Sequence, residues 1–214
     1  MNNTVTDPNI QQLWENRKPQ LWEKLNAPQI LLAMEHICGE LEQLHDCGYL
    51  SLNLRPEYIL FREDAGLVLA ENIPLNSVCD PGSSQKWILP PEKTYTAPEL
   101  LWGISDSYFQ RRRMQQYGQQ ADIYSLGLIL CQILFGWKHM TFERRCDTIP
   151  ELLSNPLEPR ELDPRFCRLP AEALEKLRLL LREMLAAHSF NRLPSMAPVK
   201  NRLCEIRDLL PRDL

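Results

Sequence analysis

The side chains that could carry out chemistry are scattered along this 214-residue chain. Its histidines have no serine, cysteine or second histidine at the spacing of a hydrolase triad or a metal site. They are His36, His45, His139 and His188. The chain also contains no G-x-G-x-x-G stretch that could hold phosphates through backbone N–H groups. The sequence therefore predicts neither a hydrolase nor a metal centre, and we expect no bound cofactor.

The seven cysteines are far apart and never form a C-x-x-C pair. This pattern disfavours both a zinc site and a disulfide framework, and it predicts free thiols in a reducing compartment. The N-terminus lacks a secretory signal, so we expect a cytoplasmic protein. The formal net charge is −4, and basic residues are dispersed apart from Arg111-Arg112-Arg113. Such a surface favours neither a nucleic acid nor a membrane as partner.

One strongly apolar stretch, residues 121–137, lies at the centre of the remaining pattern. A helix over these residues is apolar on nearly all sides, so we expect it inside the fold. It is shorter than the run of about 18 apolar residues that a membrane span needs. We expect Asp122 to cap the first turn of this helix and Gly136 to end it.

Apolar periodicity predicts the elements around this central helix. Steps of three and four residues predict amphipathic helices over 29–45, 171–188 and 198–210. Two short apolar runs, 59–61 and 67–70, predict a β-hairpin. Proline and charged or polar residues predict irregular connections over 74–94, 102–120 and 138–170. We expect one short helix within 102–120 and another near 149–153.

Two motifs stand before and at the start of the central helix. Residues 95–101 read Y-x-A-P-E-x-L, and a D-x-Y-S-L-G motif begins at Asp122. In this order and at this distance, the pair resembles the second half of a protein kinase domain, in which A-P-E is a signature. The resemblance implies a mainly α-helical domain like the C-terminal lobe of a kinase, with a small β-hairpin after the catalytic loop.

The resemblance places the kinase catalytic loop at residues 51–58, because L-R-P-E-Y-I-L from residue 54 is similar to L-K-P-E-x-I-L. Asn53 then stands where the family has its aspartate base, and Tyr58 where it has a metal-binding asparagine. An amide does not accept a proton, and a neutral phenol is a poor ligand for magnesium. The family's D-F-G corresponds to Glu71-Asn72-Ile73. The Glu71 carboxylate could hold a metal in principle, but we expect none.

The family's structural residues are present. The resemblance implies a buried ion pair between Glu99 and Arg192, and it implies that Asp122 accepts hydrogen bonds from backbone amides of the catalytic loop. The features of the nucleotide-binding N-terminal lobe are not found, and the chain begins at about the level of the hinge. From this combination we expect the N-terminal lobe to be absent and the chain not to be an enzyme.

A kinase frame with altered catalytic positions resembles a pseudokinase, specifically the KIND type (kinase non-catalytic C-lobe domain). This resemblance implies an adaptor or scaffold that binds another protein. We expect an N-terminal arm over 1–20 and the kinase-like domain over 21–214. The alternatives are a divergent or split phosphotransferase and a regulatory lobe that modulates a true kinase. The candidate contacts with a partner are Trp14, Trp22, Tyr58, Trp87, Arg111, Arg112 and Arg113.

Overall fold

The computed structural model describes residues 25–62, 66–70, 73, 75–77, 94–102 and 107–211. Within helix α4 the side chains of residues 107–117 are not described, which includes the three consecutive arginines. Several predictions from the sequence lie outside the described residues and are not tested: the 1–20 arm, its boundary with the domain, Trp14, Trp22, Glu71 and Trp87.

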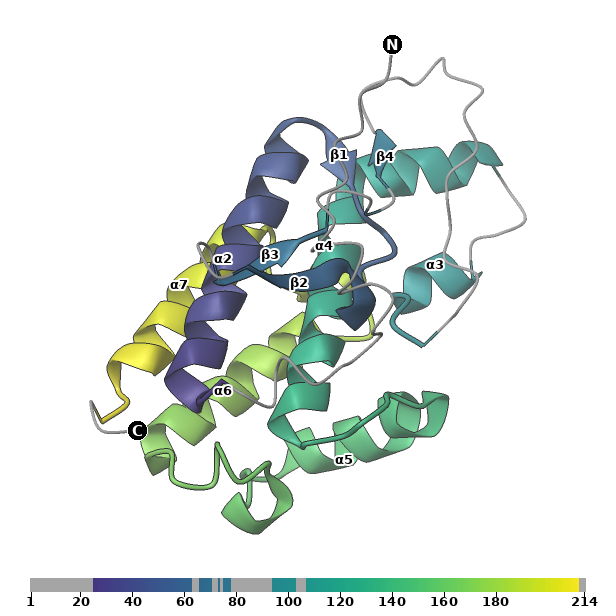
Figure 1. Cartoon of the computed structure of the whole chain (residues 1–214). Helices are drawn as coiled ribbons and strands as arrows, with labels where there is room; N and C mark the ends of the chain where they lie inside the picture. The colour runs from purple at the N-terminus through teal and green to yellow at the C-terminus, as the bar shows by residue number, and fades with distance from the viewer. Residues whose placement is uncertain are drawn as a thin grey trace.

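Helix α2, Ala27–Asp46, confirms the first amphipathic helix (Figure 1). It begins with a capping box, in which the Asn26 side chain accepts from the backbone of Gln29 and the Gln29 side chain accepts from the backbone of Asn26. It ends before Gly48, which has a positive φ of 77°, a conformation that glycine adopts without steric cost.

A loop and two small antiparallel pairs of strands follow α2. The 3₁₀ helix η2, Pro56–Tyr58, leads into strand β2, Ile59–Arg62, which pairs with β3, Gly66–Leu69. This hairpin confirms the prediction and lies against α2 (Figure 1). Strand β1, Tyr49–Leu50, pairs with β4, Asn76–Ser77. The second pair was not expected, because two-residue strands leave no alternating pattern in a sequence.

Helix α3, Pro98–Trp102, contains the A-P-E glutamate and precedes α4, Ser107–Leu134. The prediction of a short helix before a separate central helix is wrong, because one helix of 28 residues continues through both. Asp122 therefore lies in the interior of α4, and its predicted role as an N-terminal cap is also wrong. Gly118 lets α4 approach β1, since a Cβ at this position would lie 2.1 Å from Leu50 Cδ1.

The end of α4 is as predicted, with Gly136 in the left-handed region at φ 63°. The connection that follows contains a π-helix, η3, over Arg144–Thr148, which continues directly into α5, Ile149–Ser154. The short helix near 149–153 was predicted, whereas the π-helix was not. A 3₁₀ helix, η4, follows at Pro159–Glu161.

The last two long helices are α6, Ala171–Met184, and α7, Met196–Asp208, with the 3₁₀ helix η5, Ser189–Asn191, between them. Both confirm the predicted helices, although α6 ends four residues earlier than expected. Helix α7 packs along α2, and α6 packs on α7 and α4 (Figure 1). The apolar half of α4 is buried at the centre of this arrangement.

The structure confirms a mainly α-helical domain with a small β-hairpin. None of the helices in the described part of the chain combines the length and the apolar composition that a bilayer crossing needs.

Candidate functional site

The buried carboxylate of Asp122 joins α2, the loop after it and α4. Its Oδ2 accepts a hydrogen bond from Ser51 N at 2.9 Å, and its Oδ1 accepts one from Leu52 N at 2.7 Å. His45, near the end of α2, places Nε2 2.9 Å from Asp122 Oδ2. We call these four residues the Asp122 clamp. The carboxylate accepts from the loop amides in the manner that the kinase resemblance implied, while the bond to His45 was not foreseen.

The clamp holds a strained point of the backbone. Leu52 has a positive φ of 54° although it is not glycine, and its side chain is fully buried. A non-glycine residue in this conformation costs about 1–3 kcal/mol and persists only where its surroundings hold it. The short bond from Leu52 N to Asp122 supplies this restraint, so the clamp fixes the path of the residues that follow.

Asn53 and Tyr58 follow the clamp at the two positions that differ from the kinase pattern. Asn53 is 5% exposed, and its Oδ1 has no hydrogen-bond partner among the described residues. Tyr58, on η2, is half-buried and packs against the core. Arg55 Nη2 donates to the Tyr58 hydroxyl at 3.1 Å, and the Arg55 guanidinium lies 5.2 Å from the ring centroid. A cationic and an aromatic side chain thus stand together on the η2 turn.

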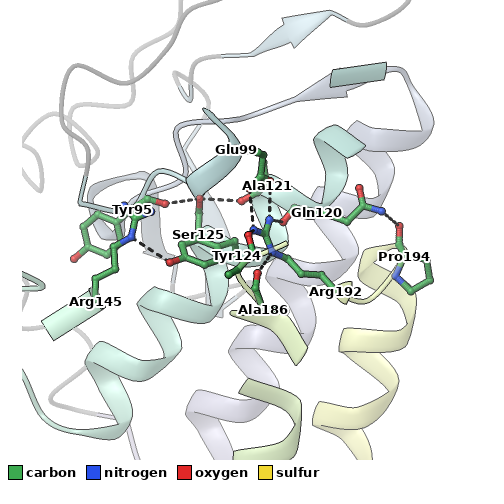
Figure 2. A network of polar contacts seen from close by, with 11 residues as sticks. Tyr95, Glu99, Gln120, Ala121, Tyr124, Ser125, Arg145, Ala186, Arg192 and Pro194 are labelled. Atoms are coloured by element: carbon green, nitrogen blue, oxygen red, sulfur yellow. Dashed lines mark hydrogen bonds and ion pairs between the residues drawn. The ribbon is translucent and has the colours of Figure 1, made fainter. Parts of the chain in front are cut away.

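A second polar network joins the A-P-E segment to the C-terminal helices (Figure 2). Arg192 Nη1 lies 2.7 Å from Glu99 Oε1, and Nη2 lies 2.8 Å from Oε2. Glu99 and Arg192, which the kinase resemblance paired, therefore form a bidentate ion pair, the strongest geometry for a guanidinium and a carboxylate. Arg192 also donates to the carbonyl oxygens of Gln120, Ala186 and Ala187. All of its donor nitrogens are used, which allows a buried charge.

The network extends through Tyr124 of α4 (Figure 2). The Arg192 guanidinium lies 4.7 Å from the centre of the Tyr124 ring, and Arg145 Nε donates to the Tyr124 hydroxyl at 3.1 Å. Burial raises the pKa of Tyr124, so its hydroxyl stays protonated. Ser125 donates to the carbonyl oxygen of Tyr95 at 2.8 Å and so ties the A-P-E segment to α4.

The structure brings some of the predicted residues together and leaves others apart. Glu99 and Arg192 form one network, and Asp122, with Asn53 next to its loop, forms another. Arg111, Arg112 and Arg113 lie on the first half of α4, in helical backbone. Sequence reasoning missed His45 as a partner of Asp122, because the two residues are 77 positions apart in the chain. It also missed Arg145, whose contacts no spacing in the sequence signals.

The cysteines within the described residues are free thiols. Burial raises the pKa of Cys38 and of Cys131, so neither thiol is a nucleophile at neutral pH. In the same part of the chain, no three His, Cys, Asp or Glu side chains gather so that they could hold a metal ion.

No protein-family profile matches the chain, but individual proteins do. It is 24% identical to serine/threonine-protein kinase mrck-1 of Caenorhabditis elegans over 115 residues, 54% of this chain and 7% of that protein. It is 29% identical to calcium-dependent protein kinase 12 of Arabidopsis thaliana over 125 residues, 57% and 23% of the two chains. A Caenorhabditis elegans protein named as a ribosomal protein S6 kinase alpha-1 is 28% identical over 172 residues, which are 79% of this chain and 18% of that protein.

These relatives correct one prediction. We expected that the chain is not an enzyme, yet the relatives are all named as protein kinases, which points to a phosphotransferase family. The match is partial, since the chain spans less than a quarter of the length of these relatives. The narrower assignments, pseudokinase and KIND type, stay predictions. The relatives and the helical architecture together make this a protein kinase C-lobe-like fold.

Proposed function

We propose that this chain is a kinase-like lobe that recognises another protein through the turn that bears Arg55 and Tyr58. The observation that carries the proposal is the contact between these two side chains on η2. Tyrosine and arginine are, with tryptophan, the residue types that are enriched among the side chains that dominate the energy of protein interfaces. Both are half-buried, so part of each side chain is already ordered before a partner arrives.

The Asp122 clamp supports this proposal by holding the turn in place. A rigid binding surface loses less conformational entropy on association than a flexible one does. The clamp fixes the backbone at residues 51 and 52, and the turn is tied to the hairpin by the bond from Ala70 N to Tyr58 O at 2.8 Å. The turn therefore presents Tyr58 from a backbone that is restrained on both sides.

The partner in this proposal is a protein in the cytoplasm. Two roles fit this proposal. The chain is either an adaptor that brings a kinase and another protein together or a regulatory lobe that modulates a true kinase.

A second candidate is phosphotransfer, and the names of the relatives favour it. In this case the residues at the kinase positions, Asn53, Tyr58 and Glu71, contribute to a divergent active site. Substrate binding then precedes transfer of a phosphoryl group from ATP, and magnesium supports that transfer in kinases generally.

The test of the proposal is photo-crosslinking followed by binding of the purified pair. A photoreactive phenylalanine analogue replaces Tyr58, and the matched control places it at Phe190, an exposed aromatic residue on η5. We expect one protein to crosslink at position 58 and not at position 190. The same protein, once purified, binds the unmodified chain without nucleotide, and Tyr58→Ala weakens this binding by about tenfold while Phe190→Ala does not.

Two results would contradict the proposal. One is the absence of any protein that crosslinks at position 58 and also binds when purified. The other is equal affinity of that protein for the Tyr58→Ala and Phe190→Ala chains. Phosphorylation of the purified protein by the chain with Mg-ATP, lost in Glu71→Gln, would instead support the second candidate.

A further inference from the structure

A cavity of about 480 Å³ opens beside the network of Figure 2. Among the described residues that line it, none belongs to the η2 turn. Its walls come from α3, α4, the π-helix η3, α5 and the end of α6. The volume lies in the range of about 300–1,000 Å³ that is typical of ligand pockets. Buried apolar side chains on two of these helices line it: Leu128, Ile149 and Leu153. The cavity therefore offers an apolar surface for an inserted group.

The charged residues that line this cavity are both arginines. Arg145 and Arg182 contribute to the lining, and no carboxylate does so among the described residues. This sign is opposite to that of the whole chain, whose formal net charge is −4. The exposed carboxylates of Asp147 and Glu151 are on the same helical segment but do not line the cavity. A ligand that carries a negative charge next to an apolar group complements this lining.

The mouth of the cavity displays an aromatic ring. Phe142 is 58% exposed. The Arg145 guanidinium lies 5.8 Å from the centroid of the Phe142 ring and 5.2 Å from that of the Tyr124 ring. The π-helix that contains Arg145 adjoins this mouth, and π-helical turns occur often at functional sites. An exposed aromatic ring beside an arginine is the composition of the centre of a protein interface.

We propose that this cavity, the α3–α5 pocket, binds a segment of a partner protein that inserts an apolar side chain and places an Asp or Glu carboxylate beside Arg182. Arg182 is exposed at the rim of the pocket, so an incoming carboxylate reaches it without displacing a packed group. Arg145 is held in place by the Tyr124 hydroxyl. The inference shares with the proposed function only the premise that the chain binds protein, and it concerns a different surface.

The test begins with selection of a random peptide library against the full chain. We expect the enriched peptides to share an apolar residue within about one or two positions of Asp or Glu. A labelled synthetic copy of the most enriched peptide is then titrated by fluorescence anisotropy. Arg182→Gln weakens its binding about tenfold, because a hydrogen-bonded contact between charges is lost. The matched control Arg160→Gln removes an equal charge from an exposed position on η4, outside the lining, and leaves the affinity unchanged.

A second readout locates the peptide on the surface. Cys146 is exposed and lines the pocket, whereas Cys47 is exposed at the end of α2. We expect the bound peptide to slow alkylation of Cys146 by iodoacetamide severalfold, as followed by mass spectrometry, and to leave Cys47 unaffected. Because both thiols are native, this measurement requires no substitution and does not depend on the folding of a variant.

The proposal is overturned if no apolar and acidic pattern is enriched, if the two arginine variants bind equally, or if the peptide does not protect Cys146. Failure of the proposed function is separate, because the peptide binding expected here is unchanged in Tyr58→Ala. Conversely, a partner that crosslinks at position 58 would not support peptide binding in the α3–α5 pocket.

Discussion

Removal of the Glu99 carboxylate tests whether the network around Arg192 stabilises the fold. The Arg192 side chain is 0% exposed and that of Glu99 is 16% exposed, so Glu99→Ala leaves a buried guanidinium without its counter-charge. Breaking such a pair costs about 3–5 kcal/mol. Three backbone carbonyls still accept from Arg192, which places the expected loss at the lower end, about 3 kcal/mol. For a chain of this size that corresponds to a fall in Tm of about 6–12 °C.

The assay is urea unfolding followed by circular dichroism, with two controls. Glu205→Ala removes a carboxylate that is 63% exposed and 3.7 Å from Lys176, and we expect it to cost about 0.5 kcal/mol or less. In an Arg192→Met background, Glu99→Ala should cost less than about 1 kcal/mol, because no buried charge is left unpaired. An equal cost of Glu99→Ala in both backgrounds would refute the reasoning.

Three further substitutions test the remaining contacts by the same unfolding assay. Asp122→Asn weakens the acceptor of two backbone N–H groups in the clamp, so we expect a loss of about 2 kcal/mol; an unchanged midpoint would show that the clamp is dispensable. Gly118→Ala places a Cβ 2.1 Å from Leu50 Cδ1 and should destabilise the fold by about 1–3 kcal/mol. Its matched control, Gly39→Ala, meets only the end of a lysine at 3.4 Å and should stabilise α2 by about 0.5–1 kcal/mol; the opposite order of the two would contradict the packing. Burial raises the pKa of the Glu35 carboxyl above its ordinary value. The folded chain therefore keeps the carboxyl proton to a higher pH than the unfolded chain does. As the pH rises past the ordinary pKa of a glutamate, the free energy of unfolding falls. The stability of Glu35→Gln relative to the unmodified chain should therefore increase between pH 4 and pH 7, and a flat or falling difference would be inconsistent with it.

Much of the fold was predictable because periodicity and turn residues are local signals. The apolar steps over 29–45 and 171–188 match α2 and α6, and Gly136 ends α4 as a left-handed glycine should. The start of α4 was not predictable from periodicity, since its first half is polar. The π-helix η3 was missed as well, because one extra residue in a helical turn leaves no distinct pattern of residue types.

The polar networks depend on contacts between distant parts of the chain, which local patterns do not reveal. Glu99 and Arg192 are 93 residues apart, and only the resemblance to kinases paired them. The same resemblance linked Asp122 to the loop, whereas local reasoning made it a helix cap. Arg145 and the α3–α5 pocket had no signal, because four separate segments of the chain meet there only in the folded protein. The relatives also corrected the expectation about enzyme activity, which had been based on the altered catalytic positions together with the missing features of the N-terminal lobe.

The most direct test of the central claim is calorimetric titration, without nucleotide, of the purified protein that crosslinks at position 58 into the full chain and into its Tyr58→Ala variant. The account predicts saturable binding to the unmodified chain and about tenfold weaker binding to the variant. No binding in the absence of nucleotide, or the same affinity for both chains, would contradict it.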